Sequence, residues 1–195
     1  RKLGVPRVDR HRYARETGAM VEALAYLHEV SGDERALAAA AESARWALAE
    51  RALPGGGFRH DANDAAGPYL GDTLAMGRAL LQLYRSTGER EWLAHAAAAG
   101  DFIATHFRAP AGFASAARGD TPIAPVPHLD ENIALARFAN LLHRHTGAPR
   151  ASRHGTTRAR MARATRRRAV APDRSRHPAR RPRDQPRPGP PHRDR

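Results

Sequence analysis

The chain has 195 residues and a formal net charge of +13, with 33 basic residues, 20 acidic residues and no cysteine. The absence of cysteine excludes disulfides, thiol nucleophiles and thiolate metal sites. No apolar run approaches the ~18 residues of a membrane span, so we expect no membrane contact and a cytoplasmic location. The length allows one globular domain.

The excess positive charge is confined to the last quarter of the chain. Residues 148–195 contain sixteen arginines and three acids, which account for the whole net charge of +13. Residues 1–147 hold 17 basic and 17 acidic residues and are neutral overall. We therefore interpret the chain as a domain at 1–147 followed by a basic tail at 148–195.

The tail at 148–195 has no Leu, Ile, Phe, Tyr or Trp and carries eight of the fifteen prolines. So little apolar surface cannot offset the entropy of the chain, so we expect disorder. Three interpretations are open: a nucleic-acid arm that binds phosphates non-specifically, a plain solvated tail, and a frameshift product. We favour the frameshift, because GC-rich DNA read out of frame yields this Arg/Pro-rich composition.

Apolar residues at helical spacing predict a series of helices within residues 1–147. The first predicted helix has a core stripe of Met20, Leu24, Leu27 and Val30. Further apolar stripes follow at Leu37–Leu48, Met76–Tyr84, Leu93–Phe107 and Ile133–Leu142. Little in these residues favours strands, so the predicted class is all-α.

The predicted helices repeat in pairs with a period of 55 to 59 residues. At an offset of 56, the aligned positions are Met20 with Met76, Leu24 with Leu80, Leu27 with Leu83 and Gly32 with Gly88. Two helices in a period of this length are typical of an α/α-hairpin array. Each Gly is predicted to form a left-handed C-cap, and the acid after it, Asp33 or Glu89, to lie at the next helix N-terminus.

The third pair stops after its first helix, at Thr146-Gly147. The first two pairs continue there with an apolar helix, whereas Ala148-Pro149-Arg150 leads into the tail. The expected fold is an incomplete α/α-hairpin toroid of about two and a half helix pairs. Arrays need at least about three repeats for stability, so we expect the isolated chain to be marginally stable, and either to aggregate or to need a protein partner at its incomplete helical edge.

Three loop segments carry a resemblance to a known family. They are Pro54–Asp61, Gly67–Thr73 and Leu129–Asn132, set among hairpins that end in Thr-Gly. About residues 5–147 resemble the C-terminal helical region of bacterial thioredoxin-domain-containing proteins related to the spermatogenesis-associated thioredoxin-like protein. That region is similar to the (α/α)6 toroid of six-hairpin glycosidases and N-acylglucosamine 2-epimerases.

The resemblance implies a carbohydrate-active or carbohydrate-binding parent protein, of which this fragment is not expected to be catalytic alone. The paired cysteines of the family's thioredoxin domain are absent, so no redox role carries over. Two alternatives stay open: a non-catalytic helical interaction scaffold of a thioredoxin-domain protein, and nucleic-acid binding through the Arg-rich tail.

The resemblance also indicates where functional residues gather, because toroids place them in the loops at one end of the inner helices. A glycosidase needs two carboxylates flanking the scissile bond, and the candidates are Asp61, Asp72, Asp130 and Glu131. An epimerase needs a histidine acid/base pair, for which His60 and His128 are the candidates. Further candidates for ligand binding are Phe58, Arg59, Tyr69 and Asn132.

Several candidates have simple structural alternatives. Asp72 and Asp130 lie where helix N-caps are expected, and Asp61 and Asp64 suit Asx turns in a Gly-rich loop. No third ligand at diagnostic spacing accompanies the neighbouring His60 and Asp61, so no metal site and no cofactor is predicted.

Overall fold

The computed structural model describes residue 4 and residues 8–64, 66–117 and 124–147. Its helices are α1 (Ala14–Ser31), α2 (Glu34–Glu50), α3 (Leu70–Thr87), α4 (Arg90–His106) and α5 (Leu129–Thr146). A short antiparallel pair, β1 (Arg108–Ala109) and β2 (Gly112–Phe113), follows α4. The predicted all-α class is confirmed, and the predictions for the tail lie outside the described residues.

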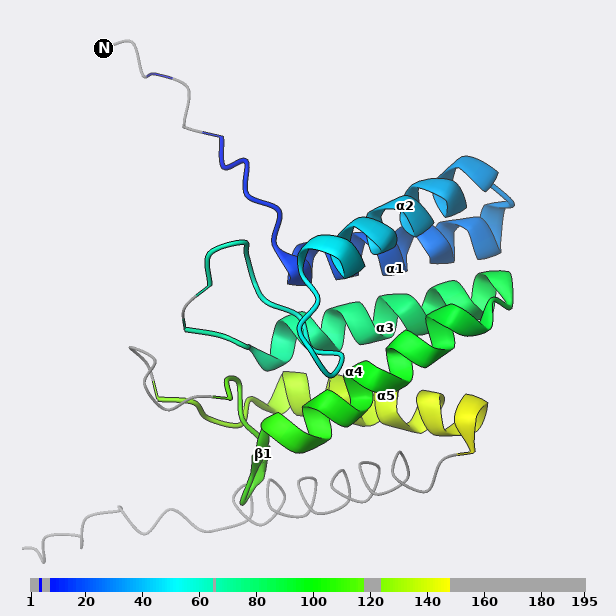
Figure 1. Cartoon of the computed structure of the whole chain (residues 1–195). Coiled ribbons are helices and arrows are strands. Elements are labelled where there is room, and N and C mark those ends of the chain that lie inside the picture. The colour runs from blue at the N-terminus through cyan, green and yellow to red at the C-terminus, as the bar shows by residue number, and fades with distance from the viewer. Residues whose placement is uncertain (1–3, 5–7, 65, 118–123, 148–195) are drawn as a thin grey trace, which may run out of the picture.

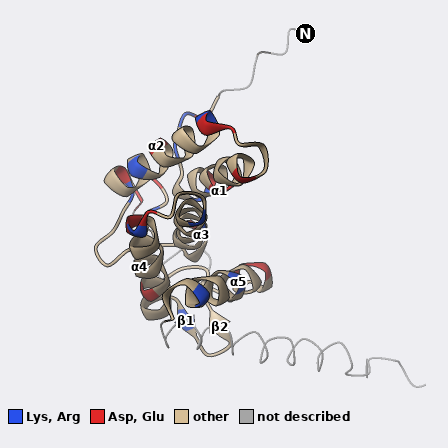
Figure 2. Cartoon of the chain, turned by 90° about the vertical axis from the view of Figure 1, so that its right-hand side faces the viewer, with Lys and Arg blue, Asp and Glu red and all other residues tan. Residues whose placement is uncertain are grey.

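The helices form two layers (Figure 1). The first layer holds α1, α3 and α5, with α3 in contact with both of the others. Helix α2 packs on α1 and α4 packs on α3, which places these two in the second layer (Figure 2). Because α1, α3 and α5 run in the same direction, their N-terminal ends lie at one end of the molecule.

The turns that end α1, α3 and α5 follow one pattern. Gly32, Gly88 and Gly147 end α1, α3 and α5 with φ angles of 71°, 73° and 64°. These left-handed values confirm the predicted glycine C-caps. The carboxylate of Asp33 accepts a hydrogen bond from the N–H of Arg35 at 2.9 Å and caps α2.

The central helix α3 is buried along its predicted stripe. Met76, Leu80 and Leu83 are each 0% exposed. The surrounding core includes Trp92, Phe102 and Ile103 from α4 and Leu135, Phe138 and Leu142 from α5. The second hairpin and α5 therefore pack around α3 as the apolar pattern predicts.

Of the predicted stripe of α1, only Leu24 packs against the core, where it is partly buried. Met20, Leu27 and Val30 are 45%, 44% and 65% exposed. The buried residues of α1 are instead Ala14, Gly18, Val21 and Ala25. A Cβ on Gly18 would lie 2.7 Å from the backbone carbonyl carbon of Ala75. Small residues thus bring the backbones of α1 and α3 together, at a separation that a larger side chain would prevent.

Candidate functional site

A pocket of about 520 Å³ lies at the N-terminal ends of α1, α3 and α5. Six of the ten sequence candidates line it: His60, Tyr69, Asp72, His128, Asp130 and Glu131. The remaining lining residues are Arg15, Gly71 and Ser115. The structure thus brings together residues from three repeats that the sequence could only place in separate loops.

The three helices that meet here each carry an acid as their third residue. These acids are Glu16 on α1, Asp72 on α3 and Glu131 on α5. Carboxylates are favoured in a first helical turn because the N–H groups and the dipole there are positive. The repeat therefore places one carboxylate from each helix at the same end of the layer.

Asp72 caps a neighbouring helix instead of its own. Its Oδ1 accepts a hydrogen bond from the backbone N–H of Arg15 in α1 at 3.0 Å. The N-cap of α3 is Tyr69, and the N-cap of α5 is His128, neither with a side-chain cap bond. The predicted N-cap roles of Asp72 and Asp130 are therefore wrong, because each helix begins one or more residues earlier than the acid suggests.

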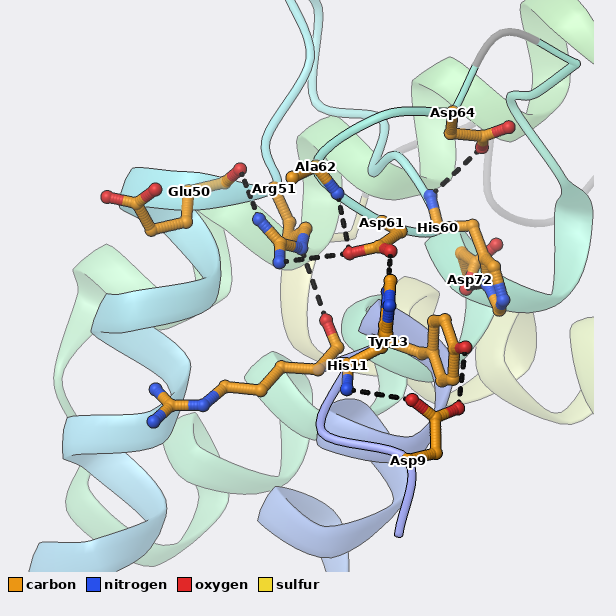
Figure 3. Close-up of polar contacts among 11 residues, drawn as sticks. Asp9, His11, Tyr13, Glu50, Arg51, His60, Asp61, Ala62, Asp64 and Asp72 are labelled. Carbon is orange, nitrogen blue, oxygen red and sulfur yellow. Dashed lines mark hydrogen bonds and ion pairs between the residues drawn. The ribbon is translucent and has the colours of Figure 1, made fainter. Parts of the chain in front are cut away.

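The most developed contact at the pocket joins His60 to Asp72. His60 Nδ1 lies 2.9 Å from Asp72 Oδ1, and the Asp72 side chain is 2% exposed (Figure 3). Since a carboxylate can only accept, Nδ1–H donates and Nε2 stays available to a ligand. Burial raises the pKa of Asp72, and the hydrogen bond from His60 opposes that rise.

Glu131 presents the least satisfied polar group at the pocket. Its Oε2 is buried and has no hydrogen-bond partner among the described residues. Its Oε1 lies 3.8 Å from Arg15 Nη1, a long ion pair. Burial raises the pKa of Glu131, and Arg15 only partly offsets the effect. A buried carboxylate oxygen without a donor is costly, which suits it to a hydrogen bond with a ligand.

Asp61 lies outside the pocket, in a separate polar network (Figure 3). Its Oδ1 accepts from Arg51 Nη2 at 3.3 Å and from the N–H of Ala62 at 2.7 Å. Its Oδ2 contacts His11 Nδ1, and this hydrogen bond lowers the pKa of Asp61. These contacts tie the loop after α2 to the segment before α1, so the structure separates Asp61 from the other candidate acids.

The same loop contains the predicted Asx turn. Asp64 Oδ1 accepts hydrogen bonds from the N–H groups of Ala66 and Gly67 at 3.2 and 2.9 Å. Its Oδ2 accepts from the backbone N–H of His60 at 3.2 Å. The turn prediction for Asp64 is confirmed, and the turn helps to hold His60 over the pocket.

Three predicted ligand-binding residues do not line the pocket. Phe58 is 1% exposed in the core, and its N–H donates to Thr73 Oγ1 at 3.1 Å. Asn132 is 6% exposed, and its amide pairs with the backbone N–H and carbonyl of Phe113 at 2.9 and 2.8 Å. The backbone N–H of Arg59 donates to the carbonyl of Arg51 at 2.9 Å. Their recorded contacts hold loops and the β-hairpin in place.

The pocket residues that sequence reasoning missed follow from the repeat. Arg15 is the second residue of α1 and Gly71 is the second residue of α3, at the same offset of 56 that aligns the two helices. Extending the alignment to the helix N-termini would have identified both. Ser115 gives no such signal, because it is placed by a loop bond from the N–H of Leu70 to its carbonyl at 2.9 Å.

Two further observations concern metal ligands and membrane spans in the described part of the chain. Within residues 8–64, 66–117 and 124–147, no group of three or more His, Asp or Glu side chains is arranged to hold a metal ion. Among the helices of these residues, none is both long enough and apolar enough to span a bilayer.

The fold is similar to several solved α/α toroids. A sugar epimerase from a ruminal bacterium matches with a TM-score of 0.64 and 14% identity, over 75% of this chain and 42% of that one. A cellobiose 2-epimerase from Spirochaeta thermophila matches with a TM-score of 0.61 and 19% identity, over 73% of this chain and 40% of that one. For a GH76 α-mannanase from Bacteroides thetaiotaomicron the TM-score is 0.66 and the identity 14%, over 84% and 46% of the two chains.

These matches confirm the predicted fold, an incomplete α/α toroid. The chain spans less than half the length of each of these neighbours. No protein-family model and no curated protein sequence matches it. At identities of 14% to 19% the likeness establishes the fold alone.

Proposed function

We propose that the pocket at the N-terminal ends of α1, α3 and α5 binds carbohydrate, and that His60 exchanges a proton with the bound sugar. The observation that carries the proposal is the 2.9 Å contact between His60 Nδ1 and the buried Asp72. It fixes one ring nitrogen and leaves the other for the ligand. Sugar hydroxyls suit the lining, since they can donate to carboxylates and accept from arginine or histidine.

The ligand class follows from the structural neighbours together with the polar lining. The neighbours include a sugar epimerase, a cellobiose 2-epimerase and an α-mannanase. Because the chain spans less than half of their length, we propose sugar binding for this chain and turnover only for a full toroid that contains it.

Two reaction classes compete for the site. Glycoside cleavage needs two carboxylates on opposite sides of the bond. Asp72 is 2% exposed and its Oδ1 is already shared by His60 and Arg15, which leaves Asp130 and Glu131. Adjacent helical residues point about 100° apart on one helix, which is a poor arrangement for flanking a bond. Proton transfer by His60, with His128 as the second group, is therefore the reaction that we favour.

Titration calorimetry with a panel of neutral mono- and disaccharides tests the proposal. We expect millimolar or tighter binding that His60→Gln weakens by about two- to tenfold, the value of one hydrogen bond between neutral groups. The matched control is His95→Gln, since His95 lies on α4 and its side chain is 41% exposed. Absence of binding for every sugar, or equal weakening by both substitutions, would overturn the proposal.

A second candidate is the interaction scaffold of a thioredoxin-domain protein. Exposed apolar side chains on α1 support a protein-interaction surface: Met20, Tyr26, Leu27 and Val30. Such a face is typical of a helix that packs against a partner. Sedimentation measurements of the chain with Leu27→Lys test this candidate, since loss of self-association or partner association is expected only if the face is used.

The division into a domain at 1–147 and a tail at 148–195 is part of the proposal, as are the frameshift origin of the tail and a cytoplasmic location. Reading the other frames after codon 147 tests the frameshift, which requires an apolar helical pattern there. Nucleic-acid binding through the tail predicts salt-sensitive retention on DNA that disappears when residues 148–195 are deleted.

A further inference from the structure

The segment before α1 reaches across to the candidate site. Tyr13, the residue before α1, lies parallel to the His60 ring, with centroids 4.5 Å apart and an interplanar angle of 10°. Tyr69 meets the same imidazole edge-on, at 6.0 Å and 88°. Together with the hydrogen bond to Asp72, these contacts define both the position and the plane of the ring.

A hydrogen bond alone would leave the imidazole free to tilt, and a tilt that takes Nδ1–H out of line with Asp72 Oδ1 weakens the bond that favours this tautomer. A stacked aromatic ring removes that freedom, because tilting would separate the two faces. The stack therefore determines the direction in which Nε2 of His60 points.

Tyr13 is itself held by a polar chain (Figure 3). Its hydroxyl donates to Asp9 Oδ2 at 2.9 Å, and Asp9 Oδ1 accepts from the N–H of His11 at 3.0 Å. His11 contacts Asp61, and Arg51 bonds both Asp61 and the carbonyl of Arg12, at 3.3 and 3.2 Å. The bond to Asp9 raises the pKa of Tyr13, as expected for a phenol that donates to a carboxylate.

We propose that Tyr13 is a positioning residue for His60, and that the network of Asp9, His11, Asp61 and Arg51 exists to hold Tyr13 against the imidazole. This role rests on the proposed function of His60. It also assigns a purpose to Asp61, which the pocket does not use. Asp61 affects His60 indirectly, because it helps to hold the segment that carries Tyr13.

The test is ¹⁵N NMR of the His60 imidazole in the full chain, which reports the tautomer without any ligand. In the wild type we expect the Nδ1–H form to dominate. Tyr13→Phe keeps the stacked ring but loses the bond to Asp9, so its tautomer population should lie between those of the wild type and the alanine variant. Tyr13→Ala should give a mixture of tautomers and weaken sugar binding by about two- to tenfold, the value of one aromatic pair.

Tyr13→Leu preserves apolar volume without a stack and serves if the alanine variant does not fold. The control is Tyr26→Ala, which removes a 58% exposed ring from α1. An unchanged His60 tautomer in Tyr13→Ala or Tyr13→Leu overturns the positioning role. Failure of the proposed function is a different result, since absent sugar binding leaves the tautomer measurement intact.

Discussion

The hairpin of α1 and α2 and the hairpin of α3 and α4 share one sequence pattern but not one pattern of burial. Met20 is 45% exposed, whereas Met76, at the equivalent position, is 0% exposed. Leu27 and Leu83 differ in the same way, at 44% and 0%. Helix α3 contacts α1, α4 and α5, whereas the main packing partners of α1 in the described part are α2 and α3.

The difference shows that a repeat determines which positions are apolar, while the neighbours of each copy decide which of them are buried. Helix α1 uses Gly18 and small alanines to approach α3 closely. Its large apolar residues are thereby left on another face. Both α1 and α3 carry the apolar pattern of a helix that is covered by neighbours on several sides, but only α3 has such neighbours in the described part.

The same truncation at equivalent positions should have very different effects. Leu83→Ala opens a cavity in the core and is expected to cost about 2–5 kcal/mol of unfolding free energy. Leu27→Ala removes a side chain that water already reaches and should cost about 0.5 kcal/mol. Urea denaturation of both variants measures the contrast, and equal losses would show that α1 is buried in solution.

Replacing the glycine that ends α1 or α3 should have the same effect on stability, because the two turns have the same geometry. Gly32 and Gly88 have φ angles of 71° and 73°, and nothing lies within 4 Å of a Cβ added to either. Replacement by alanine is expected to cost about 1–2 kcal/mol at each position, through left-handed strain alone. Asparagine, which tolerates this conformation better, is the control. Thermal melts that differ strongly between Gly32→Ala and Gly88→Ala would contradict the equivalence.

The smallest effect concerns the acids at the third position of the helices. Burial raises the pKa of Glu131 above its unfolded value near 4.5. Ionisation of Glu131 therefore destabilises the folded state. This cost is absent at a pH below the unfolded pKa, grows between the unfolded and the folded pKa, and is complete above the folded pKa. Glu131→Gln should raise the melting temperature near pH 8 but not near pH 4. The matched control is Glu16→Gln, which changes the exposed acid at the third position of α1.

Much of the fold was predictable because its signals are local. Helix turns were marked by Gly32 and Gly88, and α3 by an apolar stripe that its neighbours bury on most sides. The buried face of α1 was not predictable in this way, because small residues give a weak apolar pattern. Gly18 becomes informative only once α3 is known to lie against it.

The candidate site was predictable only in part, for a related reason. His60 and Glu131 stood out because polar residues in loops at helix ends suggest chemistry. The roles of Asp72 and Tyr13 depend on partners far away in the sequence, Arg15 and His60 respectively. No local pattern distinguishes a carboxylate that caps its own helix from one that caps another.

The way in which α1 begins couples the two repeats. Its first N–H groups, those of Ala14 and Arg15, donate to the carbonyl of His60 at 3.0 Å and to Asp72 at 3.0 Å. Both acceptors lie beyond the first hairpin in the chain. The first turn of α1 can thus be completed only when the second hairpin has docked, which supplies the nearest-neighbour term that makes a repeat array fold cooperatively. His60 and Asp72 therefore both line the pocket and link the first hairpin to the second.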